Sequence, residues 1–119
     1  MVGSVPQFSL AKSFPGFTPR GPWLVTPDEF DNPDDLELTC AIDGEQVQKG
    51  RTSELIFSVP VLIAKLSAVL PLLPGDVIFT GTPAGVGMGR SPQRFLHAGE
   101  VLTSSIEGIG EMRQVLVRT

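Results

Sequence analysis

The chain has 119 residues, enough for one domain with a core of its own, and its 41% hydrophobic and 18% charged residues exclude a disordered protein. The formal net charge of −4 argues against nucleic acid as a partner, because phosphate binding depends on clustered Lys and Arg. Cys40 is the single cysteine and cannot form an internal disulfide, so we expect a reducing, cytoplasmic location. The apolar stretch 55–73 is interrupted by serine, proline and lysine, which excludes a membrane span. We see no signal peptide, since no basic segment leads into an apolar one.

The N-terminal segment places aromatic side chains among turn residues. Phe14, Phe17 and Trp23 alternate with prolines and glycines, which is typical of an extended, rigid coil with aromatic anchors. A short strand is predicted over 23–25. Lys12 is a lone cation among apolar and small residues and has two interpretations. It is either a solvated surface lysine or a compact cation that meets a substrate carboxylate or enolate.

The next segments predict an acidic turn followed by a hairpin. Residues 27–35 carry five carboxylates but lack the central glycine and closing glutamate of a calcium loop, so a solvated turn is favoured. Residues 36–42 alternate apolar and polar, as a half-buried strand requires. Asp43-Gly44 is typical of a type I′ turn, and 45–48 returns as a polar edge strand. Cys40 on the apolar face is interpreted as a small core residue rather than a nucleophile.

One helix is predicted after Ser58. Apolar residues recur at helical spacing from Val59 to Leu70, with Ser58 as N-cap, Pro60 in the first turn and Pro71 helping to end it. We expect this helix to pack on a sheet.

The glycine-rich stretch 74–89 is the centre of the sequence. Pro74-Gly75 opens it as a turn, residues 77–79 predict a buried strand, and the side chains from Thr80 onward become small. Small residues after a strand allow a ligand to approach the main chain closely. A plain glycine-rich connection is the alternative. A phosphate loop is excluded, because no helix opens after the glycines and no Gly-Lys-Ser/Thr is present.

The C-terminal third predicts two more strands. Residues 100–106 alternate, Gly108-Ile109-Gly110 turns the chain, and 112–117 forms the last strand. His97 has no second histidine or cysteine near it in the sequence, so it cannot head a metal site by itself.

Together these motifs resemble the fumarylacetoacetate hydrolase family. The matching pieces occur in the family's order and cover roughly residues 10 to 117: Lys12-Ser13-Phe14, Gly21-Pro22-Trp23, Asp43-Gly44-Glu45, Thr52–Phe57, Pro74–Gly87, Gly99-Glu100 and Ile106–Gly110. The resemblance implies a mainly β fold with one or two helices (α+β), a mixed β-roll or sandwich. It implies a divalent metal, usually Mg²⁺, and 2-oxo or 1,3-diketo acid substrates. Members hydrolyse C–C bonds between carbonyls, or decarboxylate, isomerise or hydrate related acids.

The resemblance also implies roles for three residues. Lys12 matches the family's substrate-binding lysine, which supports developing negative charge and is therefore a catalytic candidate. Thr82 matches the threonine that hydrogen-bonds the substrate. Gly81 matches a position where the main chain runs close to the ligand. A small oxo acid is the expected partner, the complete protein is expected to be a homodimer, and neither nucleic acid nor membrane is expected to bind.

The sequence departs from the family pattern at the metal. The family holds its metal through a Glu-x-Glu pair and an Asp that precede the Lys-Ser-Phe segment, whereas the eleven residues before Lys12 contain no acidic residue or histidine. No metal ligand is therefore assigned, and residues 1–119 are interpreted as the C-terminal half of the domain. A catalytically silent binding or assembly module is the alternative. If upstream strands are missing, 77–80 and 101–106 are expected to lose neighbours.

Overall fold

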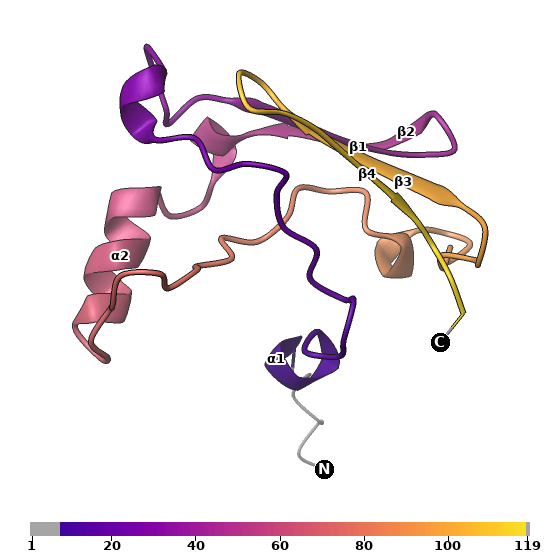
Figure 1. Cartoon of the computed structure of the whole chain (residues 1–119), viewed down its shortest axis with the longest axis horizontal. Coiled ribbons are helices and arrows are strands. Elements are labelled where there is room, and N and C mark those ends of the chain that lie inside the picture. Colours follow the sequence, from indigo (N-terminus) through magenta and orange to yellow (C-terminus); the bar gives the residue numbers. More distant parts are fainter. Residues whose placement is uncertain (1–7, 119) are drawn as a thin grey trace.

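Four antiparallel strands form the sheet around which the rest of the chain is arranged (Figure 1). The computed structural model describes residues 8–118. Strands β1 (Glu37–Ile42) and β2 (Glu45–Arg51) form one hairpin, and β3 (Val101–Ile106) and β4 (Gly110–Val115) form a second. The sheet order β2-β1-β3-β4 leaves β2 and β4 at the edges. With two helices beside this sheet, the prediction of a mainly β fold is confirmed.

The first hairpin forms as its turn residues predict. Asp43 and Gly44 have φ values of 49° and 84°, the two left-handed conformations that a type I′ turn requires. The Asp43 carboxylate accepts a hydrogen bond of 2.8 Å from the backbone N–H of Val101, which ties the turn to the start of β3. Register is therefore fixed at the turn as well as by the apolar face.

A β-bulge interrupts the pairing of β1 with β2. Cys40 lies opposite Gln48, while the next residue of β1, Ala41, lies opposite Gln46. Val47 is thus the extra residue of the bulge, and its carbonyl accepts a hydrogen bond of 3.1 Å from the Arg90 guanidinium.

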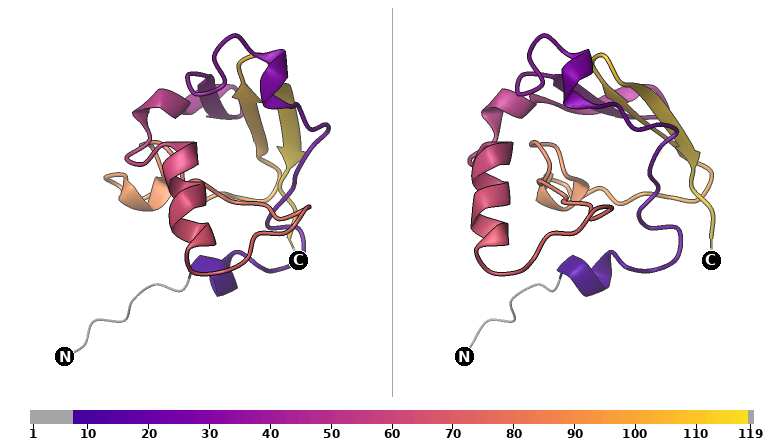
Figure 2. Two further views of the ribbon diagram at one scale, coloured as in Figure 1. Left: turned by 90° about the vertical axis from the view of Figure 1, so that its left-hand side faces the viewer. Right: turned by 60° about the vertical axis from the view of Figure 1, so that its left-hand side comes forward.

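The predicted helix is present but does not pack as expected. Helix α2 (Val59–Ser67) begins after Ser58 with proline in its first turn, and it ends before Leu70. None of its residues is buried, and it stands beside the sheet rather than on its face (Figure 2), so the expected sheet packing is wrong. Helix α1 (Phe8–Ala11) is a single turn. Within residues 8–118 no helix combines the length and apolar character that crossing a membrane requires.

Two predicted strands are absent from the described chain. Residues 23–25 and 77–79 have an irregular backbone, and the side chains of Val77 and Phe79 are exposed. A strand forms only where a neighbour completes its hydrogen bonds, and neither segment has one among residues 8–118. The expectation that 101–106 loses a neighbour is also wrong, because β3 pairs with β1 on one side and β4 on the other.

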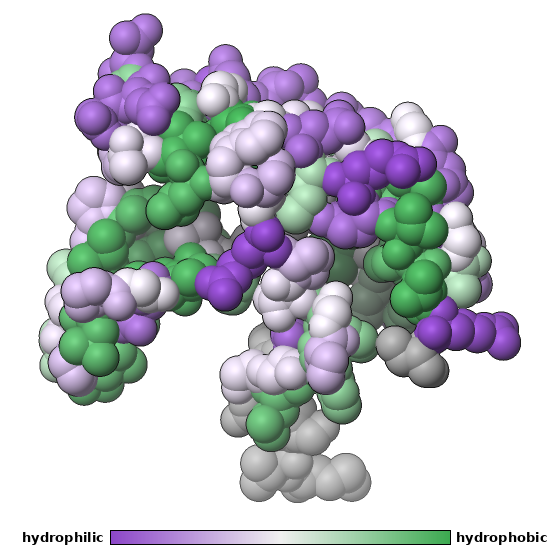
Figure 3. Space-filling model, viewed as in Figure 1, coloured by the Kyte–Doolittle hydropathy of each residue, from purple (hydrophilic) through white to green (hydrophobic). Residues whose placement is uncertain are grey.

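The apolar residues are left largely uncovered. The accessible surface is 9660 Å², against about 6,200 Å² for a compact protein of this mass. The radius of gyration of 16.0 Å compares with about 13.5 Å for a compact domain of this length. Ile42 is the single large hydrophobic side chain that is buried within the described part. Figure 3 shows hydrophobic side chains at the surface over α2 and toward the C-terminus. A second layer is needed to complete the core.

The aromatic coil docks on the turn between β3 and β4. The indole N–H of Trp23 donates a hydrogen bond of 2.6 Å to the carbonyl of Ile109. A Cβ at Gly110 would lie 2.9 Å from the Trp23 ring, and one at Gly108 would lie 2.6 Å from the Phe30 ring. Both rings therefore rest directly on glycine backbone. The predicted anchor role is confirmed for Trp23 alone, since Phe14 and Phe17 are exposed and pack on each other with ring centroids 5.4 Å apart.

Candidate functional site

An open groove of about 570 Å³ lies at the β2 edge of the sheet. One wall is the small-residue loop 80–84, which includes Gly81 and Thr82. The opposite wall is formed by residues 49–57 at the end of β2 and beyond it, and Leu38 and Leu62 also contribute. The groove thus combines threonine hydroxyls and main chain with apolar side chains and with the charged residues Lys49, Arg51 and Glu54. Such a mixed lining is typical of sites for small polar molecules.

Gln48 on β2 holds the loop that carries Thr82. Its side-chain nitrogen donates one hydrogen bond of 2.9 Å to the Thr82 hydroxyl oxygen and another of 2.9 Å to the carbonyl of Pro83. Both N–H bonds of the amide are therefore used by the loop. The sequence does not point to Gln48, because 34 residues separate it from Thr82 and a polar residue on an edge strand carries no local signal.

Two glycines allow the loop to lie against β2. A Cβ at Gly85 would meet the carbonyl oxygen of Val47 at 2.1 Å, and one at Gly50 would meet the Pro83 side chain at 2.9 Å. Arg90 links the loop to β2, since its guanidinium donates hydrogen bonds to the carbonyls of Gly85 at 3.2 Å and Val47 at 3.1 Å. The Val47 carbonyl belongs to the bulge residue, so the loop is anchored to β2 at the bulge.

Lys12 does not line this groove. It follows α1, its side chain is exposed, and its backbone carbonyl accepts a 3.3 Å hydrogen bond from the Thr18 hydroxyl. Figures 1 and 2 place α1 on the far side of the connection 68–90 from the sheet. The structure therefore brings Gly81 and Thr82 together and leaves Lys12 apart, and the substrate roles of all three stay predictions.

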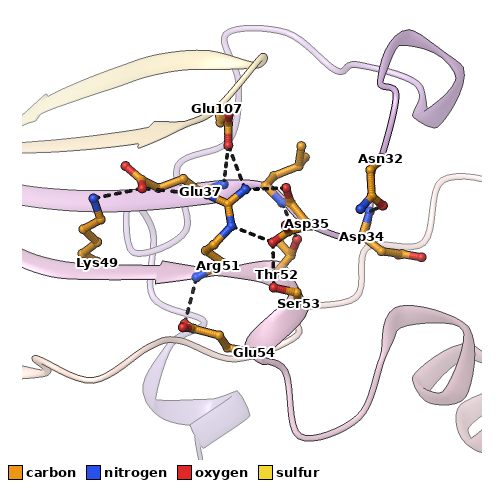
Figure 4. A network of polar contacts seen from close by, with 11 residues as sticks. Asn32, Asp34, Asp35, Glu37, Lys49, Arg51, Thr52, Ser53, Glu54 and Glu107 are labelled. Carbon is orange, nitrogen blue, oxygen red and sulfur yellow. Dashed lines mark hydrogen bonds and ion pairs between the residues drawn. The ribbon is translucent and has the colours of Figure 1, made fainter.

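Arg51 braces the wall of the groove (Figure 4). Its guanidinium pairs with the Asp35 carboxylate at 2.6 Å and the Glu107 carboxylate at 3.3 Å, and it donates to the Asp35 carbonyl at 2.8 Å. The Ser53 hydroxyl donates to the same Asp35 carboxylate at 2.6 Å. These hydrogen bonds, first from Arg51 and then from Ser53, hold the pKa of Asp35 below its ordinary value. The network fixes the chain at the end of β2, where the groove wall begins.

The described residues do not fit a divalent metal. Among residues 8–118 no group of three or more His, Cys, Asp or Glu side chains converges on one point. The carboxylates of Asp35 and Glu107 are held by Arg51, and Glu100 accepts from Arg94 at 2.8 Å and from the His97 backbone at 2.7 Å. Hard cations need several oxygen ligands that are not already neutralised.

Relatives of the chain are hydrolases and isomerases. A 2,4-didehydro-3-deoxy-L-rhamnonate hydrolase of Sphingomonas sp. (strain SKA58) is 46% identical over 109 residues, covering 91% of this chain and 38% of the relative. A candidate HpcE protein of Mycobacterium smegmatis superposes with a TM-score of 0.93 at 60% identity, covering 99% of this chain and 44% of that one. Other solved relatives are named isomerases.

A third relative was solved with ligands. Maleylpyruvate hydrolase of Sphingobium sp. SYK-6, in complex with a manganese(II) ion and pyruvate, superposes with a TM-score of 0.73 at 36% identity. The match covers 82% of this chain and 34% of that one. The chain spans about two fifths of the length of the curated relatives it matches. The family model described as fumarylacetoacetate (FAA) hydrolase C-terminal matches residues 1–117, and the chain belongs to this family.

Proposed function

We propose that residues 1–119 form the substrate-holding part of a hydrolase that cleaves a C–C bond between the carbonyls of a 2-oxo or 1,3-diketo acid. In such a reaction an acylpyruvate and water give pyruvate and a carboxylic acid. The observation that carries the proposal is the position of the Thr82 hydroxyl, which lies on the wall of an open groove and accepts a hydrogen bond from Gln48. The chain that holds this groove belongs to the family named above. Thr82 binds a substrate oxygen and Gly81 lets the acid approach the main chain. Lys12 lies away from the groove in residues 8–118, so its positive charge is proposed to reach the acid in the whole protein.

The whole protein is proposed to depend on a divalent metal whose ligands lie outside residues 8–118. Support comes from the relative that binds manganese(II) and pyruvate, whereas the described residues offer no ligand set. The uncovered apolar residues are proposed to pack on the part of the domain that holds those ligands, in a cytoplasmic homodimer. Nucleic acid is not proposed as a partner because the net charge is −4, and a membrane is not proposed because the apolar stretch 55–73 is interrupted by polar residues and prolines.

Isomerisation, decarboxylation or hydration of the same acids is the second candidate, favoured by the relatives named isomerases. A silent binding or assembly module is the third. Product analysis of an acylpyruvate incubation separates them: hydrolysis gives pyruvate and a second acid, isomerisation gives one product of unchanged mass, and decarboxylation releases carbon dioxide. Absence of any product would favour the binding module.

The roles of Thr82 and Lys12 are tested by kinetics in the native protein with its metal. Thr82→Val keeps the shape but deletes the hydroxyl, so we expect about a tenfold rise in KM, the value of one hydrogen bond. Lys12→Met keeps the stem and deletes the charge, so kcat falls on the order of 10²-fold. Thr103→Val on β3 and Arg113→Met on β4 are the controls, since neither residue lines the groove. Kinetics as in the controls would leave Thr82 with a structural role and Lys12 as a solvated surface lysine.

A further inference from the structure

The side-chain amide of Gln48 can face the loop in only one orientation. Its nitrogen lies 2.9 Å from the carbonyl oxygen of Pro83. A carbonyl can only accept a hydrogen bond, so the opposite orientation of the amide would set two acceptor oxygens against each other. The nitrogen must therefore face Pro83, and the orientation of Gln48 is fixed by the backbone of the loop.

This orientation determines the direction of the Thr82 hydroxyl. The same nitrogen lies 2.9 Å from the Thr82 oxygen, so Gln48 donates and the hydroxyl accepts. A hydroxyl that accepts through a lone pair still has its own proton to donate. Within residues 8–118 no acceptor takes that proton, and Thr82 lines the groove.

We infer that Gln48 is a positioning residue, which fixes the Thr82 hydroxyl so that its proton is offered to an oxygen of the acid bound in the groove. The inference rests on the proposed function, since it requires an oxo acid in the groove. Carboxylate and carbonyl oxygens are acceptors, so a hydroxyl committed as donor matches the substrate class. A freely rotating hydroxyl would lose part of its binding energy to ordering.

The support under Gln48 is rigid. Gln48 lies on β2 next to the bulge residue Val47, whose carbonyl is held by Arg90 at 3.1 Å. Gly50 further along β2 packs directly on Pro83. Gln48 thus acts from a hydrogen-bonded strand on a loop residue, and a site built on strands holds its binding groups more precisely than one built on loops alone.

A double-mutant cycle tests the inference with pyruvate as the probe. Binding to the native metal-loaded protein is measured by calorimetry for wild type, Gln48→Met, Thr82→Val and the double variant. Methionine keeps the volume of Gln48 and deletes both donors. Each single variant is expected to weaken pyruvate binding about tenfold, and the double variant also about tenfold, because Gln48 acts through the Thr82 hydroxyl. Gln46→Met, on the same strand and exposed, is the matched control and should bind as wild type.

The possible outcomes separate the inference from the proposed function. If the double variant bound pyruvate about 100-fold more weakly than wild type, the losses from Gln48→Met and Thr82→Val would be independent. Gln48 would then merely support the loop, and the inference would fail. Normal binding by Gln48→Met with weak binding by Thr82→Val would also overturn it, while the proposed function stands. Normal binding by Thr82→Val would overturn the role of Thr82 in the proposed function. Wild-type protein that binds no pyruvate would overturn both.

Discussion

Replacing Gly85 by alanine is the sharpest test of how the loop is seated on β2. The new Cβ would lie 2.1 Å from the carbonyl oxygen of Val47, whereas carbon–oxygen contacts begin at about 3.3 Å. The loop must therefore retreat by about 1 Å. Such a shift stretches the 2.9 Å hydrogen bonds from Gln48 to Thr82 and Pro83 beyond useful length.

The loss has two components of known size. Two broken hydrogen bonds cost about 2 kcal/mol of unfolding free energy together. A 1 Å displacement of a substrate-binding group costs on the order of 10²-fold in kcat/KM. A separate strain cost of about 1–3 kcal/mol arises because alanine replaces glycine at a φ of +107°. That last cost must be measured apart from the other two.

Gly75→Ala is the control for strain. Its φ of +97° is close to that of Gly85, yet nothing lies within 4 Å of the added Cβ. Urea unfolding and acylpyruvate kinetics are compared for both variants of the native protein. We expect Gly85→Ala to be about 2 kcal/mol less stable than Gly75→Ala and to lose activity that the control keeps. Hydrogen exchange should accelerate over 80–90 in Gly85→Ala alone. Equal behaviour of the two variants would refute the argument that the loop is held by β2.

Three further predictions follow from the same structure. The 119-residue chain by itself should bind no Mg²⁺ tightly, and calorimetric heat at micromolar metal would contradict this. Asp35 has a lowered pKa, so its ionised form stabilises the fold above about pH 4 and this contribution is lost as pH falls through the lowered pKa. Asp35→Asn should therefore flatten the decline of Tm with acid, and an unchanged profile would show that the Arg51 pair adds no stability. The isolated chain should self-associate through its exposed apolar residues, whereas a monodisperse monomer with a sharp melt would show a closed core.

Elements whose cause is local could be predicted from the sequence. The alternation of 36–42, the Asp43-Gly44 turn and the proline that follows Ser58 specify β1, its hairpin and the start of α2 within a few residues. Residues 77–79 have equally good strand composition, yet a strand also needs a neighbour that the pattern cannot supply. The composition of a segment shows which secondary structure it can form, but a strand forms only when a neighbouring strand pairs with it.

The candidate site shows the same division. Thr82 and Gly81 were found through the resemblance, since a small-residue loop alone is ambiguous. Gln48 and the Asp35–Arg51 pair were missed, because their partners are brought together only by the fold. An acidic residue before one strand, a basic residue at the end of the next and an amide on an edge strand are all too common in sequences to single out. Lys12 was found by resemblance too, yet the described chain leaves it away from the groove.

The contact of two aromatic rings with two glycines has an evolutionary consequence. Trp23 and Phe30 occupy the space that side chains at Gly110 and Gly108 would need. Because Gly108 and Gly110 have φ values of +72° and +124°, a homologue with a larger residue at either position needs a changed turn backbone as well as a smaller ring at position 30 or 23. Substitutions at these positions should therefore occur as pairs across the family. The segment that carries Lys12 is attached to this turn through Trp23. A lineage that changed one pair would therefore also shift the position of Lys12, although the turn is far from it in sequence.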